Sequence, residues 1–149
     1  MSKNSFRINA AKIAISVYII DQLLKWRLQG INYELMPGVS LIYGENFGIA
    51  FGLPVPVWGS ILMTFLLLVV GAIAVSKYFD LSKRLNSILV GLVVGGALGN
   101  LFDRLIHGFV IDYISIWKWP IFNFADACIV AAAGIILLKS EKLLKQKLK

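Results

Sequence analysis

Residues 85–106, LNSILVGLVVGGALGNLFDRLI, decide the fold of this chain. The segment is apolar over most of its length, and about 20 such residues form a helix that crosses the hydrocarbon core of a membrane. Gly91, Gly95, Gly96 and Gly99 recur at spacings that place small residues along a helix and let neighbouring transmembrane helices approach closely. A phosphate-binding glycine loop is excluded, because no strand precedes the run and no Lys-Ser or Lys-Thr follows it. The segment is therefore predicted to be a closely packed membrane helix.

The composition of the 149-residue chain is that of a small membrane protein. Hydrophobic residues make up 58%, charged residues only 15%, and the mean hydropathy is +0.79. The net charge is +7, but the basic residues flank apolar segments instead of forming a patch on a water-soluble domain, so no nucleic-acid partner is expected. A single Cys128 cannot form an intrachain disulfide, and a single His107 cannot supply a multi-histidine metal site. Neither a metal nor a cofactor is expected.

Working outward, four apolar segments are long enough to be membrane spans, and no internal repeat or interdomain linker separates them. The fold class predicted is an all-α polytopic membrane protein with four transmembrane helices and a small extracytoplasmic loop region that contains β-structure. The whole chain, 1–149, forms one domain. The predicted spans are approximately 8–28, 57–75, 85–106 and 120–138. Residues 29–56 form the extracytoplasmic loop region, where alternation over 39–43, bounded by turn residues, favours a strand or hairpin.

The orientation follows from the basic residues, which are concentrated on the cytoplasmic side of membrane proteins. The loops 29–56 and 107–119 carry only Lys118, whereas the basic residues concentrated at the opposite side of the spans are Lys3, Arg7, Lys12, Lys77, Lys83, Arg84, Lys139, Lys142, Lys145, Lys147 and Lys149. Both termini are therefore expected in the cytoplasm. Trp58, Trp117 and Trp119 fall at the outer span ends, where indole rings favour the headgroup region.

This topology gathers the remaining polar residues at the outer side of the membrane. Asp112 and Asp126 are the most informative, because an acid at membrane depth is costly and usually functional. Asp126 is expected roughly 9 Å along the fourth helix from Pro120, given about 1.5 Å of rise per residue. Two nearby carboxyl groups that share one proton have the chemistry of an aspartic hydrolase, with one as general base and the other as general acid.

Helical spacing allows a structural interpretation for some of these residues. Asp21 with Lys25, and Asp103 with Arg104, are pairs that neutralise one another and fix helix packing. Asp112 and Asp126 have no basic residue three or four positions away, so a purely structural role would require a partner from another helix.

Other functions remain open from the residues alone. A small proton-coupled transporter or channel subunit also carries intramembrane acids, although its polar groups are expected across the full membrane thickness. A noncatalytic assembly factor would tolerate loss of either aspartate. Ser115 with Lys118 is a less favoured Ser-Lys dyad.

Five blocks resemble, in order, those of the lipoprotein signal peptidases, also called type II signal peptidases, over essentially the whole chain. Their residues are DQxxK at 21–25, NFGIAFG at 46–52, GGALGNLFDR at 95–104, GFVIDY at 108–113 and FNFAD at 122–126.

The resemblance implies an intramembrane aspartic endopeptidase of the bacterial cytoplasmic (inner) membrane, multi-pass, with its active site near the outer leaflet. Its substrates would be diacylglyceryl-modified prolipoproteins, cleaved on the amino side of the lipidated cysteine, and globomycin-like cyclic peptides would inhibit it. Membrane lipids are its other expected partners, and a monomer is expected. By the resemblance the site residues have three roles: Asp112 and Asp126 as catalytic; Asn46, Asn100, Arg104 and Asn123 as substrate-binding; Asp21, Lys25 and Asp103 as supporting.

Overall fold

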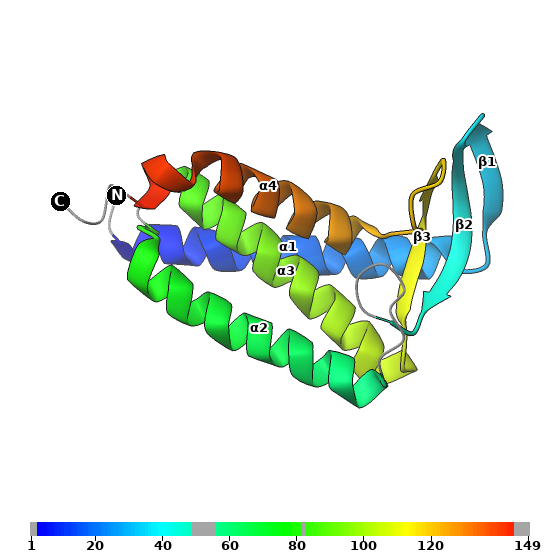
Figure 1. Cartoon of the computed structure of the whole chain (residues 1–149), viewed down its shortest axis with the longest axis horizontal. Helices are drawn as coiled ribbons and strands as arrows, with labels where there is room; N and C mark the ends of the chain where they lie inside the picture. Colours follow the sequence, from blue (N-terminus) through cyan, green and yellow to red (C-terminus); the bar gives the residue numbers. More distant parts are fainter. Residues whose placement is uncertain (1–2, 49–55, 82, 145–149) are drawn as a thin grey trace.

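The structure, a computed structural model, describes residues 3–48, 56–81 and 83–144, and the side chains of 9–48, 56–77, 79–81 and 83–139. Within these residues four helices lie side by side and a small sheet stands at one end of them (Figure 1). In chain order the elements are α1 (Lys3–Leu28), β1 (Asn32–Met36), β2 (Val39–Asn46), α2 (Val57–Tyr78), α3 (Arg84–His107), β3 (Val110–Ile116) and α4 (Phe124–Leu144).

Helix α3 is the centre of the bundle and contacts α1, α2 and α4. Its glycines face the backbones of two of these neighbours. A Cβ atom added at Gly95 would lie 2.5 Å from the carbonyl oxygen of Ala14 in α1, and one at Gly96 would lie 2.7 Å from that of Ala125 in α4. The prediction that the glycine run serves close helix packing is confirmed.

The three strands form an antiparallel sheet in the order β1-β2-β3. The hairpin expected near residues 39–43 is present, with its turn at residues 37–38. Gly38 has a positive φ of 82°, and its carbonyl oxygen accepts a hydrogen bond from Trp117 N at 2.7 Å. The third strand, Val110–Ile116, lies where the sequence analysis predicted only a loop. Its alternation and β-branched content are typical of a strand.

The fourth helix begins at Phe124, later than the predicted start of the span at residue 120. The reason is that the backbone of the preceding residues bonds to β3: Phe122 N donates to Ile114 O at 3.0 Å, and Phe122 O accepts from Ile114 N at 2.8 Å. Asp126 therefore lies in the first turn of α4 rather than 9 Å along a helix from Pro120, and the expectation for its depth is corrected.

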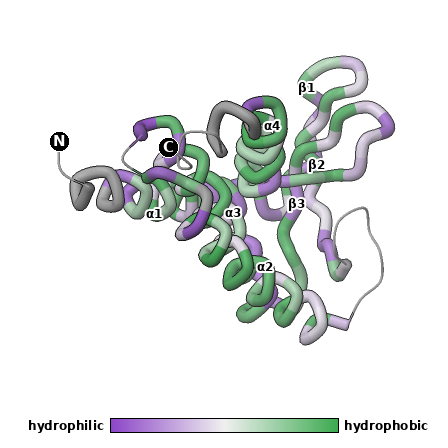
Figure 2. The backbone as a smooth tube through the Cα atoms, turned by 60° about the vertical axis from the view of Figure 1, so that its left-hand side comes forward, coloured by the Kyte–Doolittle hydropathy of each residue, from purple (hydrophilic) through white to green (hydrophobic). Residues whose placement is uncertain are grey.

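The other helices agree with the predicted spans to within a few residues at most ends, and α1 begins earlier, at Lys3. Two of the four described helices, over Val57–Lys77 and Arg84–His107, are long and apolar enough to cross a membrane by length and composition. Hydrophobic residues predominate along them in Figure 2. The side chains of residues 1–8 and 140–149, which carry many of the flanking basic groups, lie outside the described part.

We expect Gly95→Ala to destabilise the protein by about 1–3 kcal/mol, because the added methyl group meets backbone that cannot rotate away. Gly134→Ala in α4 is the matched control, since a Cβ there has no atom within 4 Å and alanine favours the helix. Thermal unfolding in detergent measures both. Equal melting temperatures for the two variants would contradict the close approach of α1 and α3.

Candidate active site

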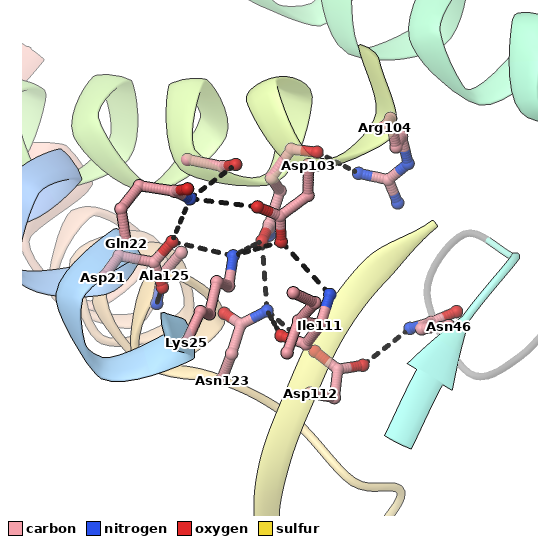
Figure 3. A network of polar contacts seen from close by, with 12 residues as sticks. Asp21, Gln22, Lys25, Asn46, Asp103, Arg104, Ile111, Asp112, Asn123 and Ala125 are labelled. Carbon is pink, nitrogen blue, oxygen red and sulfur yellow. Dashed lines mark hydrogen bonds and ion pairs between the residues drawn. The ribbon is translucent and has the colours of Figure 1, made fainter. Parts of the chain in front are cut away.

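The polar residues singled out from the sequence form one connected network where the helices meet the sheet. Figure 3 shows the part of it around Lys25, Asn123 and Asp112. The structure brings together all nine of them: Asp21, Lys25, Asn46, Asn100, Asp103, Arg104, Asp112, Asn123 and Asp126. Helices α1 and α3 contribute their last turns, β2 its last residue, β3 its middle, and α4 its first turn.

A buried ion cluster forms the base of this network. Lys25 is 1% exposed, and its Nζ lies 2.7 Å from Asp21 Oδ2 and 2.8 Å from Asp103 Oδ2. The other oxygen of Asp21 accepts a hydrogen bond from Ala125 N at 3.0 Å. Charges out of contact with water are tolerated when they are paired and hydrogen-bonded. The cluster therefore ties the ends of α1 and α3 to the start of α4.

The two neutralising pairs interpreted from the sequence, Asp21 with Lys25 and Asp103 with Arg104, have different outcomes. Asp21 does pair with Lys25, but Asp103 pairs with Lys25 as well, rather than with Arg104. Successive helical residues point about 100° apart. Asp103 consequently faces α1, while the guanidinium of Arg104 donates from Nη2 to Gly48 O at 3.1 Å, just beyond β2.

Asn123 starts α4 and also joins the two aspartates. Its Oδ1 accepts from Asp126 N at 2.9 Å, and its own N donates to Asp126 Oδ2 at 3.4 Å, which is the reciprocal arrangement of a capping box. Its Nδ2 donates to Asp112 Oδ1 at 2.7 Å. One buried side chain therefore sets both the beginning of the helix and the placement of Asp126 relative to Asp112.

Two further asparagine amides donate to the same carboxyl groups. Asn46 Nδ2 donates to Asp112 Oδ2 at 2.9 Å, and Asn100 Nδ2 donates to Asp126 Oδ1 at 2.7 Å. The orientation of Asn46 is fixed by Gly48 N, which donates to its Oδ1 at 3.0 Å. All three asparagines therefore present N–H groups to the aspartate pair.

Asp112 is 2% exposed. Burial, together with the nearby charge of Asp126, raises the pKa of Asp112 to about 7, against the opposing effect of the amides of Asn46 and Asn123. A carboxyl group with this pKa is half protonated near neutral pH. The pair can therefore hold one proton under physiological conditions.

Two cavities flank the aspartate pair. The larger, about 560 Å³, is lined by Asp126, Asn100 and Arg104 and extends along the apolar side of α4 past Ile129 and Val130. The smaller, about 380 Å³, is lined by Asp112 and the end of β2. Residues shared by both linings are Asn46, Pro120 and Ile121. Asp126 therefore lines the larger cavity and Asp112 the smaller one, and the two cavities share three lining residues.

Two supporting residues stand in the quoted sequence blocks but were assigned no role from sequence. Gln22 Nε2 donates to Asp103 Oδ1 at 3.0 Å and so completes the ion cluster. Tyr113 is buried, and its hydroxyl accepts from Phe124 N at 3.1 Å at the start of α4. Burial raises the pKa of Tyr113, so the hydroxyl stays protonated. Gln22 directly follows Asp21 and Tyr113 directly follows Asp112, and this adjacency is the only sequence feature that could have indicated their roles.

Paired carboxyl groups that can share one proton beside a cavity are typical of aspartic hydrolases. Their position at the end of a bundle of apolar helices places this site in the class of membrane aspartic hydrolases.

Comparison with known proteins gives the family. Residues 13–142 match the family described as signal peptidase (SPase) II, and the chain belongs to this family of aspartic peptidases, the lipoprotein signal peptidases, which remove signal peptides from prolipoproteins. The membership favours the peptidase hypothesis over the transporter and the assembly factor.

Individual relatives agree with this assignment. The lipoprotein signal peptidase of Photorhabdus laumondii is 39% identical over 117 residues, which cover 73% of this chain and 70% of the relative. That of Klebsiella aerogenes is 36% identical over 140 residues, 85% of each chain. Two solved structures of bacterial membrane enzymes, both 26% identical, superpose with TM-scores of 0.80 and 0.68. The match to the first covers 89% of this chain and 87% of the solved chain, and the match to the second covers 87% of this chain and 90% of the solved chain.

Two replacements of Asn123 distinguish its role as the cap of α4 from its contact with Asp112. Asn123→Ala removes both the helix cap and the amide donor, and we expect it to lower stability by about 1 kcal/mol relative to Asn123→Ser, because serine still caps a helix. Both variants lack the N–H that reaches Asp112, and both should lose cleavage of a prolipoprotein substrate. Melting temperature and cleavage rate measure the two effects. Cleavage by Asn123→Ser at the wild-type rate would show that the amide contact to Asp112 is dispensable.

Proposed function

We propose that this chain is an endopeptidase that removes the signal peptide from diacylglyceryl-modified prolipoproteins, cleaving on the amino side of the lipidated cysteine, with Asp112 and Asp126 as its catalytic residues. The observation that carries this proposal is that Asn123 donates to both carboxyl groups, while Asp112 and Asp126 line neighbouring cavities.

Asp112 is the member of the pair that carries the proton at rest. Its pKa of about 7 supports this assignment. Asp126 is the member that lines the larger cavity, where its Oδ1 accepts from Asn100 Nδ2. Asp126 is therefore the general base that binds and activates a water molecule.

The reaction then proceeds without a covalent intermediate. Asp126 takes a proton from water as the water oxygen bonds to the scissile carbonyl carbon, and the proton on Asp112 is hydrogen-bonded to the developing oxyanion. As the C–N bond breaks, the leaving amine takes the proton held by Asp126. Asp112 keeps or recovers its own proton when the carbonyl re-forms, and the pair returns to its starting state.

The larger cavity suits the lipidated side of the substrate. Its wall along α4 is apolar, and Val130 in this wall is 69% exposed, which opens it toward the surrounding lipid. A diacylglyceryl chain can remain in this apolar channel while the adjacent peptide bond meets the carboxyl groups. The amide of Asn46 and the guanidinium of Arg104 stand at the same cavity to bind the peptide backbone. A globomycin-like cyclic peptide would inhibit by occupying this space.

We further propose that all four helices span the membrane and that the site lies near the outer leaflet of a bacterial cytoplasmic membrane. The outer faces of α1 and α4 carry exposed apolar side chains, including Ile15, Leu23 and Leu137, as expected for contact with lipid. The first turn of α1 and the last turn of α4 lie at the end of the bundle away from the sheet, which supports two cytoplasmic termini (Figure 1).

Tryptophan side chains mark the opposite end of the bundle. The four in the chain all lie toward the sheet and are at least 61% exposed: Trp26, Trp58, Trp117 and Trp119. Exposed indole rings at one level are typical of a membrane–water interface. Trp26 lies in the last turn of α1, and Trp117 and Trp119 directly follow β3, the strand that carries Asp112, which supports an active site near the outer interface.

Neutralising either aspartate tests the catalytic assignment. Asp112→Asn and Asp126→Asn should each reduce cleavage of a diacylglyceryl-modified prolipoprotein by at least about 10³-fold, because one loses the acid and the other the base. Glu34→Gln makes the same chemical change on an exposed strand and should cleave at the wild-type rate. A folded aspartate variant that retains cleavage would refute the assignment, and an inert wild type would refute the proposed substrate.

The pH dependence follows from the pKa of Asp112. Below about pH 7 Asp112 holds its proton; above it Asp112 loses this proton and no acid remains to stabilise the oxyanion. We therefore expect kcat/KM to fall about tenfold per pH unit on the alkaline side, with an apparent midpoint near 7 that belongs to the pair. Initial rates from pH 5 to 9 in detergent measure the profile. A rate that increases through pH 7 would mean that Asp112 acts ionised and that the two roles are reversed.

A further inference from the structure

Lys25 makes one contact that charge neutralisation does not require. Two of its three partners are the carboxylates of Asp21 and Asp103, and the third is Asn100 Oδ1 at 3.0 Å, in a neutral side chain. The ammonium group is buried, so each of its N–H donors needs an acceptor. The third donor therefore bonds to a side chain that itself donates to Asp126.

This contact determines which end of the Asn100 amide faces Asp126. Asn100 Oδ1 accepts from Lys25 Nζ and from Asn123 Nδ2, both at 3.0 Å, and this leaves Asn100 Nδ2 to donate to Asp126 Oδ1 at 2.7 Å. The reversed amide would place N–H groups against an ammonium group and a carbonyl oxygen against a carboxylate. Both contacts would be repulsive.

The three asparagines differ in what orients them. Backbone N–H groups fix Asn46, through Gly48, and Asn123, through Asp126. Asn100 is oriented by side chains, and Lys25 is the charged one among them. Lys25 itself is held by carboxylates from two helices, so its direction is fixed before substrate enters.

We propose that Lys25 is a positioning residue for the reaction: it fixes the orientation of Asn100 and thereby the oxygen of Asp126 that receives the proton from water. The inference rests on the proposed function of the aspartate pair. Lys25 lines neither cavity beside that pair, so it acts on the substrate only through other residues. Its loss should consequently lower kcat more than it changes KM.

A double-mutant cycle tests this route of action. Lys25→Met should lower kcat by about 10- to 100-fold, the cost typical of losing a residue that orients an active-site group, with KM changed less than about threefold. In an Asn100→Ala background the same replacement should lower kcat by less than about threefold, because the amide it orients is gone. Equal losses in the two backgrounds would overturn the proposal.

Two controls separate positioning from charge balance and packing. Ser87→Ala removes a different buried polar contact of α3, the hydrogen bond from Ser87 Oγ to Leu81 O, outside this network, and should leave kcat within about threefold of wild type. Lys25→Met with Asp103→Asn keeps the net charge of the cluster and serves if Lys25→Met does not fold. Loss of kcat in this charge-balanced variant supports positioning, and wild-type kcat overturns it.

The inference and the proposed function fail in different ways. Wild-type protein that does not cleave lipidated prolipoprotein would refute the function itself. Active wild type, inactive Asp126→Asn and a fully active, folded Lys25→Met would leave the peptidase mechanism intact and refute only the role of Lys25.

Discussion

Backbone contact between α3 and its neighbours α1 and α4 is the constraint on which the site depends. A Cβ at Gly99 would lie 2.5 Å from Asp21 Oδ2, so the carboxylate of Asp21 occupies space that any other residue at position 99 would fill. The same approach brings Asp103 within 2.8 Å of Lys25. Without glycine along α3, the three helices would stand farther apart and the buried charges would lose their partners.

Several acidic side chains are buried in one small region, and each must be neutralised by a positive charge, hold a proton or accept hydrogen bonds. Lys25 compensates Asp21 and Asp103, while the aspartate pair is contacted mainly by neutral amides. Burial and the charge of Asp126 raise the pKa of Asp112, and neutral amide donors oppose this increase less than an ammonium group would, so Asp112 has the capacity to hold a proton. The asparagines around the pair therefore distinguish it from the ion cluster: they donate hydrogen bonds without adding a positive charge.

The elements of the sheet end have complementary tasks in the proposed reaction. Strand β3 carries Asp112, α4 begins with Asp126, and the segment between them bonds back to β3 through Phe122, which fixes the spacing of the two carboxyl groups. The larger cavity along α4 then provides an apolar surface next to a polar centre. Such a junction suits a substrate that is a lipid on one side and a peptide on the other.

The sequence by itself determined the apolar class of the protein, the approximate helices, the use of glycine for packing, and the set of polar residues at one end. These follow from local composition and helical spacing, which one chain shows directly. Only the tertiary structure decided that Asp103 pairs with Lys25 rather than Arg104, that residues 110–116 form a strand, and that α4 starts at Phe124. Each of these depends on partners distant in sequence: a lysine on α1, a strand in the loop region, and the backbone of Ile114. The orientation of Asn100 by Lys25 belongs to the same group, because spacing along a chain cannot show which end of an amide faces which charge.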